Sequence, residues 1–77
     1  MIEIAPNIVV DPATRFSKPI IQGTRVTVEE VLRYLAGGMD AVEIEQEYGV
    51  PKQGVRAAID YAASFLKGET ISTPKQE

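Results

Sequence analysis

Residues 40–60 read DAVEIEQEYGVPKQGVRAAID, and this stretch decides the fold. Asp40 and Glu43 have the spacing of a capping box, so a helix is predicted to begin there. Gly49 ends that helix because glycine adopts positive φ without strain, and Pro51 suits the first turn of the next helix. Apolar residues on both sides of the break can lock the two helices together: Ile44, Tyr48, Val50, Val55 and Ala58. The spacing predicts a helix-turn-helix unit, with a generic helical hairpin as the alternative.

A further helix is predicted to precede this unit. Thr27 and Glu30 form a second capping box, and Gly37-Gly38 ends the helix. Its apolar stripe consists of Val28, Val31, Leu32, Leu35 and Ala36. The last helix, which is expected to stop near Gly68, has an apolar face predicted to be buried: Val55, Ala58, Ile59, Ala62, Phe65 and Leu66.

The N-terminal part of the chain is predicted to contribute a small β-element. Ile8–Val10 is a short β-branched run stopped by Asp11-Pro12, and residues 19–22 and 25–27 flank Gly23-Thr24 as in a tight hairpin. From residue 69 to residue 77 nothing is periodic, and a flexible tail is expected. The sequence thus predicts one mainly α domain over residues 1–68, with three helices and a small N-terminal β-hairpin.

The composition excludes several classes of function. A chain of 77 residues has room for one small core. It contains no cysteine and no histidine, so a thiolate nucleophile, an imidazole base, a disulfide and the usual zinc site are ruled out. We therefore expect no enzyme activity, no cofactor and no metal. The longest uncharged run, residues 4–10, is too short for a membrane span, and a cytoplasmic protein is expected.

The charges are segregated along the chain, although the formal net charge is only −3. Residues 40–49 hold four acidic residues and no basic one. Three bases and one acid lie within residues 50–68, and three bases and no acid within residues 12–28. The acidic stretch is predicted to be either a solvated helix face or a surface for a basic protein. The other two stretches predict basic patches.

The start of the last helix carries the candidate DNA-binding residues, Lys52, Gln53 and Arg56. In a helix-turn-helix protein this part of the helix enters the major groove. Gln53 could then pair with an adenine edge, Arg56 with guanine or phosphate, and Lys52 with phosphate. Two features favour a solvated face instead. Arg56 and Asp60 have the spacing of an intrahelical ion pair, and Gly54 weakens the helix.

The turn at Gly23-Thr24-Arg25 is the second candidate site. Thr24 and Arg25, together with Arg15 and Lys18, could hold an anion or a partner carboxylate. The alternative, which we favour, is that the turn residues serve the local backbone.

Several strings in the chain resemble one known family. They are Asp11-Pro12, KPIIQGTRVTV at residues 18–28, LAGG at 35–38 and VRAAIDYA at 55–62. Over residues 8–66 the chain is similar to the domain of unknown function 433 family, and Ser17 stands where that family usually has glycine. The resemblance implies a homeodomain-like or winged helix-turn-helix fold. It also implies an antitoxin role of the VapB kind, beside a nuclease-like toxin.

Two functions of different classes remain open. The first is a DNA-binding antitoxin that autoregulates its operon on operator DNA and neutralises a toxin, with Ile71 in the tail as a candidate toxin contact. The second is a protein-binding or scaffold module that does not touch DNA. We expect a homodimer, because a lone hairpin and a small core are only marginally stable.

Overall fold

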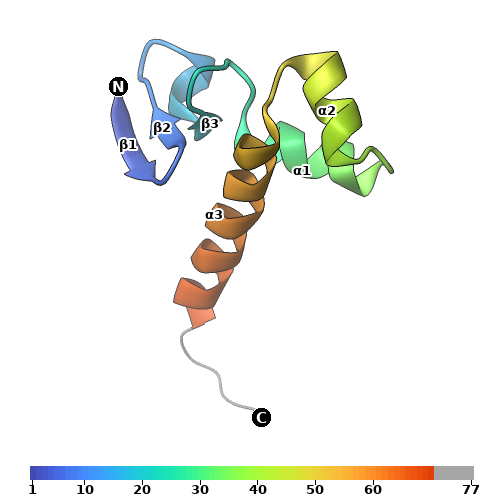
Figure 1. Ribbon diagram of the computed structural model, residues 1–77. Helices are drawn as coiled ribbons and strands as arrows, with labels where there is room; N and C mark the ends of the chain where they lie inside the picture. Colours follow the sequence, from blue (N-terminus) through green and yellow to red (C-terminus); the bar gives the residue numbers. More distant parts are fainter. Residues whose placement is uncertain (71–77) are drawn as a thin grey trace.

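The computed structural model describes residues 1–70, with side chains described through Lys67. Three helices and a small sheet make up this part of the chain (Figure 1). The helices are α1 (Val28–Ala36), α2 (Ala41–Tyr48) and α3 (Lys52–Thr70). The strands are β1 (Ile2–Ala5), β2 (Ile8–Val10) and β3 (Ile20–Ile21). The prediction of a mainly α fold with an N-terminal β-element is confirmed.

Helices α1 and α2 begin at the two predicted capping boxes. The Thr27 hydroxyl accepts a hydrogen bond from the Glu30 amide at 3.0 Å, and the Glu30 carboxylate accepts one from the Thr27 amide at 2.9 Å. Asp40 and Glu43 repeat this exchange at 2.9 Å in both directions. Each box satisfies two amides that would otherwise lack an intrahelical partner, so the sequence fixes where these helices start.

The sheet differs from the predicted hairpin. Its strand order is β1-β2-β3, with antiparallel pairing throughout, and the hairpin that forms joins β1 to β2. Within residues 19–27 the only ladder contact is the bridge between Ile20 and Thr27, with the Ile21 amide donating to the Val26 carbonyl at 2.9 Å. The segment expected as the second strand of that hairpin, residues 25–27, does not extend the ladder, because Thr27 is already the N-cap of α1.

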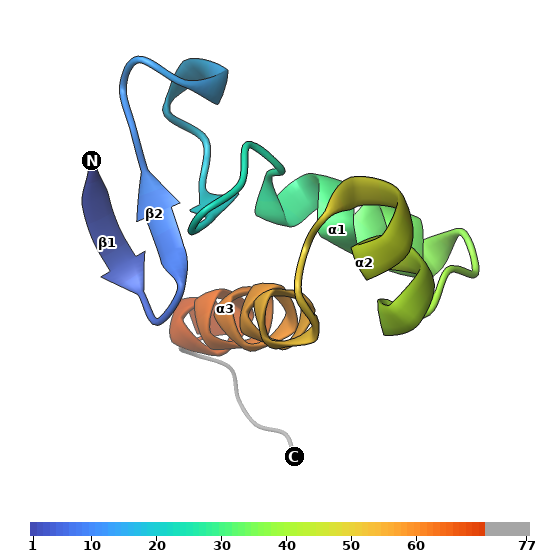
Figure 2. The same ribbon diagram turned by 45° about the horizontal axis from the view of Figure 1, so that its top comes forward.

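The core lies where β2, β3 and the three helices meet. Its largest fully buried side chains are Ile8, Ile21, Val31, Ile44 and Val50. The strands β1 and β2 stand on one side of α3, and α1 and α2 stand on the other (Figure 2). Helix α3 therefore connects the sheet to the other two helices.

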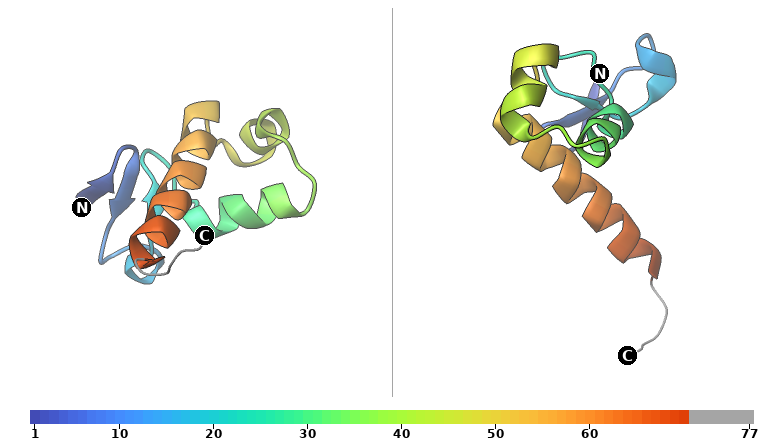
Figure 3. Two further views of the ribbon diagram at one scale, coloured as in Figure 1. Left: turned by 90° about the horizontal axis from the view of Figure 1, so that it is seen from below. Right: turned by 90° about the vertical axis from the view of Figure 1, so that its right-hand side faces the viewer.

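The predicted buried face of α3 is correct at Val55 and Ala58 but wrong at Ile59, Phe65 and Leu66. Val55 and Ala58 are buried, but Ile59 is 43% exposed, and the second half of the helix projects past the body of the domain (Figure 3). Phe65 and Leu66 lie on this projecting half and are also exposed. Sequence periodicity identifies an apolar face, but it does not show how far the rest of a small chain reaches along a helix of 19 residues.

Candidate nucleic-acid interface

The connection between α2 and α3 has the features expected of a helix-turn-helix. Gly49 adopts a left-handed conformation with φ of 72°, and its amide donates to the Glu45 carbonyl at 2.9 Å. Val50, which follows, is fully buried, as is Ile44 on α2. The left-handed glycine turns the chain, and these two side chains then hold α2 against the start of α3.

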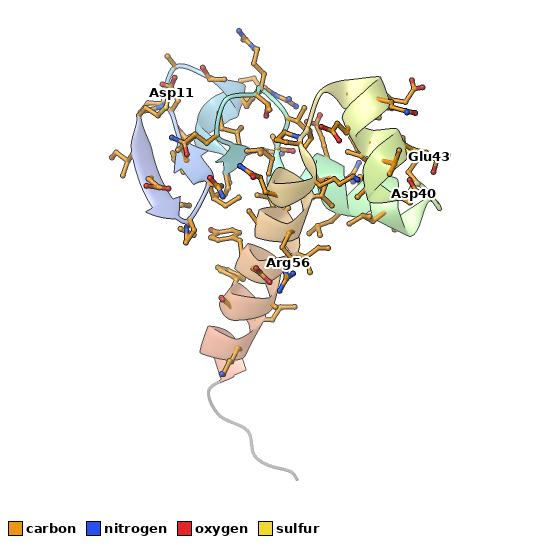
Figure 4. All side chains as sticks on the ribbon, viewed as in Figure 1. Asp11, Asp40, Glu43 and Arg56 are labelled. Carbon is orange, nitrogen blue, oxygen red and sulfur yellow. The ribbon has the colours of Figure 1, made fainter. Side chains whose placement is uncertain are left out.

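The three candidate DNA-binding residues lie in the first two turns of α3, and Lys52, Gln53 and Arg56 are all exposed. Arg56 projects away from the helix (Figure 4), and its Nε lies 3.4 Å from both carboxylate oxygens of Asp60. The two side chains are 77% and 62% exposed. An ion pair this exposed contributes little to stability, so Arg56 can exchange Asp60 for another partner at small cost.

A shallow cavity of about 290 Å³ separates α3 from the turn between β1 and β2. Gln53, Arg56 and Tyr61 line one side, and Pro6 and Asn7 line the other. The Glu3 carboxylate holds this turn by accepting a hydrogen bond from the Asn7 amide at 3.0 Å. The β1–β2 turn therefore lies beside the exposed surface of α3 and is held in place by this hydrogen bond.

The acidic residues of α2 belong to a different helix from the candidate DNA-binding residues. Asp40 and Glu43 lie at the start of α2, to the right of Arg56 in Figure 4. Both carboxylates are engaged in the capping box, while Glu45 and Glu47 are exposed. Repulsion between these carboxylates and DNA phosphates would be strongest if α2 lay flat on the duplex, so the arrangement favours contact through α3 alone.

Two of the basic residues assigned to the second candidate site make ion pairs within the chain. Arg15 donates to both carboxylate oxygens of Glu30, at 3.0 and 2.8 Å, and to the Arg25 carbonyl at 2.8 Å. Lys18 lies 3.5 Å from a carboxylate oxygen of Glu29. Arg15 is thus a clamp between the N-terminal segment and α1, and a role in anion binding would require Arg15 and Lys18 to leave these partners.

The turn itself serves the backbone, as the favoured alternative predicts. The Thr24 hydroxyl donates to the Ile21 carbonyl at 2.8 Å and accepts from the Val26 amide at 3.0 Å. Gly23 adopts φ of 85°. The Arg25 side chain is exposed and makes no ion pair within residues 1–67. Arg25 is therefore the member of the proposed site that is best placed to meet a partner.

The Arg15 clamp makes stability depend on pH. Hydrogen bonds from Arg15, and then from the Thr27 amide, lower the pKa of Glu30 from its ordinary 4.5 to about 2. Because the folded-state pKa is the lower one, the stabilisation is complete above pH 4.5 and is lost as the pH falls towards 2. Glu30 is one-third exposed, so after allowance for solvent screening the expected loss is about 1–2 kcal/mol.

Urea unfolding of the wild type and of Glu30→Gln between pH 7 and pH 2 measures this effect. The variant is expected to be less stable at pH 7 and to converge with the wild type near pH 2. A difference in stability that stays constant over this pH range would contradict the assignment.

A strained segment that the sequence did not reveal lies beside the clamp. Arg15, Phe16 and Ser17 are consecutive residues with φ of 52°, 57° and 64°, the left-handed region that favours glycine. Ser17 is the position at which the resemblance pointed to glycine, and its positive φ gives the physical reason for that glycine. The Phe16 side chain is 92% exposed. No periodic pattern in the sequence signals a left-handed turn of non-glycine residues.

Within the described residues, no three His, Cys, Asp or Glu side chains form a group that could hold a metal ion. No described helix combines the length and apolar character that crossing a bilayer requires. Ile71, the candidate toxin contact, and most of the predicted tail lie outside the described residues.

Comparison with known proteins gives one match. The model of the family described as a protein of unknown function (DUF433) matches residues 8–62. Searches of curated proteins and of solved structures gave no match. The matched range runs from β2 into α3 and includes α2 and the turn that leads into α3, while β1 and the end of α3 lie outside it. Because the match covers most of the sequence, the chain belongs to the DUF433 family.

Proposed function

We propose that this protein is a non-enzymatic DNA-binding regulator of the antitoxin type, which uses the start of α3 to contact operator DNA. The observation that carries the proposal is the placement of Lys52, Gln53 and Arg56. All three are exposed in the first two turns of α3, directly after a left-handed glycine turn. This is the arrangement by which helix-turn-helix proteins present side chains to the major groove.

Each of the three residues has a distinct part in this proposal. Gln53 donates to and accepts from an adenine edge, and Arg56 makes a bidentate contact with guanine or pairs with a phosphate. Lys52, at the first helical position, contacts phosphate and adds affinity without sequence preference. To bind, Arg56 gives up an exposed ion pair with Asp60, which costs little.

The antitoxin part of the proposal rests on the family resemblance together with the chemistry of the chain. A sequence without cysteine or histidine lacks a thiolate nucleophile and the side chain that most often serves as general base, so binding is a more natural role than catalysis. An antitoxin must also contact a second protein. The exposed Phe16 beside the Arg15 clamp offers an anchor for such a contact.

A protein-binding module that does not touch DNA is the second candidate. The exposed Glu45 and Glu47 on α2 favour it, because they would attract a basic protein and repel phosphates. The two candidates differ in which helix meets the partner. DNA binding depends on α3, and binding of a basic protein would depend on α2.

Replacing Arg56 by alanine tests the proposed function. Binding to the DNA upstream of the protein's own gene is expected to weaken by about 1–3 kcal/mol, or roughly 5- to 150-fold, with folding unchanged. Fluorescence anisotropy with a labelled duplex measures the affinity, and circular dichroism checks the fold.

Arg33→Ala is the matched control for this experiment. Arg33 is 75% exposed and forms the same kind of intrahelical ion pair, with Glu29, but lies on α1. Its removal is expected to change the affinity by less than about threefold, as for a distant surface charge. Equal losses of DNA affinity in the two variants would mean that only the overall charge of the protein matters. No loss of affinity in either variant would refute DNA binding through α3.

A further inference from the structure

The second half of α3 forms one wall of an apolar groove, and α1 forms the other. Val28 and Leu32 line the α1 side, while Ala62, Phe65 and Leu66 line the α3 side. The groove, which we call the α1–α3 groove, has a volume of about 470 Å³. A space of this size accommodates several side chains of a partner.

The α3 wall continues the stripe that is buried in the first half of the helix. Ala58, Ala62 and Phe65 follow one another at spacings of four and three residues, which places them on one face. Ala58 is fully buried, but Phe65 is 59% and Leu66 is 67% exposed. Ile59 lies three residues before Ala62 and extends the same exposed apolar surface. The projecting half of α3 thus presents a core-like face that nothing within residues 1–67 covers.

We propose that a second copy of this chain covers the α1–α3 groove. The projecting half of α3 in the second copy packs antiparallel to the projecting half of α3 in the first. The surface is self-complementary, because the same face carries both the side chains that project and the groove that receives them. In a two-fold dimer, Phe65 and Leu66 of each copy enter the groove beside Val28 and Leu32 of the other. That reciprocity is what an isologous interface requires.

Charge at the groove permits two identical faces to meet. Glu29 is the charged residue among those that line it. Its carboxylate lies 2.7 Å from Arg33 and 3.5 Å from Lys18, so its charge is compensated within each copy. An uncompensated charge would repel its own symmetry mate, and here that obstacle is removed.

The exposed apolar side chains can form the centre of a small dimer interface. Specific interfaces bury about 800 Å² on each partner, with an apolar centre and a polar rim. Phe65, Leu66 and Ile59 are 59%, 67% and 43% exposed, so they supply the apolar part of that area, and the rim of the groove supplies the rest. Because such an interface falls at the lower end for specific contacts, the dimer is expected to have a dissociation constant of tens of micromolar rather than nanomolar.

This dimer leaves the proposed DNA-binding surface free, since Lys52, Gln53 and Arg56 occupy the side of α3 opposite Ala58, Ala62 and Phe65. The inference does not rest on DNA binding, and it can be tested without DNA.

Sedimentation of the full chain tests the proposal. A protein concentration of about 50 μM is used, because it lies in the range of dissociation constants expected for an interface of this size. At this concentration the average mass of the wild type is expected to lie well above the 8.4 kDa of one chain, and to approach about 16.8 kDa, twice that mass, as the concentration is raised. Phe65→Asp is expected to sediment as a monomer with unchanged helical circular dichroism, because the side chain is already exposed within one copy. Val42→Asp is the matched control, because Val42 is a 45% exposed apolar residue on α2 that does not line the groove, and this variant is expected to remain a dimer.

A monomeric wild type would overturn the proposal and would leave the groove to residues 71–77 of the same chain or to a different protein. A Phe65→Asp variant that stays dimeric would overturn it equally, since the interface would then lie elsewhere.

Cysteine pairing provides an independent test, because the natural chain has no cysteine. Leu32→Cys and Phe65→Cys are made as separate chains, mixed and oxidised. The expected product is the mixed disulfide between the two variants, which mass spectrometry separates from either symmetric product. A Val42→Cys chain, whose cysteine lies on α2, is the control. If Leu32→Cys forms as much mixed disulfide with Val42→Cys as with Phe65→Cys, the antiparallel arrangement is contradicted.

Discussion

Replacing Ile44 by alanine is expected to lower the free energy of unfolding by about 2–5 kcal/mol. Ile44 is fully buried on α2, in contact with the cluster that joins both neighbouring helices and β3. Truncation removes apolar contacts and leaves a cavity that the short helix cannot collapse to fill. For a chain of 77 residues this is a large part of the total stability.

Ile59→Ala is the matched comparison, since it deletes the same atoms from a side chain that is 43% exposed. In the Phe65→Asp background, which is expected to be monomeric, it should cost less than about 1 kcal/mol. Urea unfolding curves are recorded for the wild type, Ile44→Ala, Phe65→Asp and the double variant with Phe65→Asp and Ile59→Ala. They give the loss of unfolding free energy caused by each alanine substitution. Equal costs at the two positions would show that Ile59 is buried and that the packing of α3 described above is wrong.

Gly54→Ala is expected to destabilise the fold by about 1–3 kcal/mol, although alanine is the better helix former. A Cβ at this position would come within 2.7 Å of the Ile21 Cγ2 and within 3.1 Å of a Val50 methyl group. Ile21 and Val50 are both buried, so neither can move aside freely. The glycine therefore lets the start of α3 lie directly on β3, and this contact fixes the angle at which α3 leaves the domain.

A double-mutant cycle with Ile21→Ala isolates this contact. Once the Ile21 methyl groups are removed, Gly54→Ala is expected to be nearly neutral or stabilising, because its higher helix propensity is then no longer opposed by the clash. If Gly54→Ala costs the same in both backgrounds, close approach to β3 is not the reason for the glycine.

How far the sequence predicts this structure depends on the range of the interaction involved. Capping is local, so Thr27 and Asp40 locate the starts of α1 and α2 correctly, and Gly49 does the same for the turn before α3. The exposure of Ile59 depends instead on where the rest of the domain ends, and no pattern within α3 contains that information. Helix propensity alone makes Gly54 unfavourable, and the reason for a glycine there is found only in the folded structure, where Ile21, distant in the sequence, lies against it.

The candidate site shows the same division. Lys52, Gln53 and Arg56 are correctly placed on the outside of α3, because helical periodicity relates them to the buried Val55 and Ala58. The ion pair between Arg15 and Glu30 joins residues from a left-handed segment and from α1, and sequence spacing does not predict it. Of the basic patch inferred from composition, Arg15 therefore serves within the chain, where it holds the N-terminal segment against α1.

The proposal that α3 binds DNA is tested most directly by measuring how the affinity for the upstream DNA depends on salt, for the wild type and for Lys52→Ala. If Lys52 and Arg56 contact phosphates, the logarithm of the binding constant falls linearly with the logarithm of the salt concentration, with a slope close to one unit smaller for Lys52→Ala. A binding constant that is insensitive to salt, or a slope that Lys52→Ala leaves unchanged, would contradict DNA recognition through the start of α3.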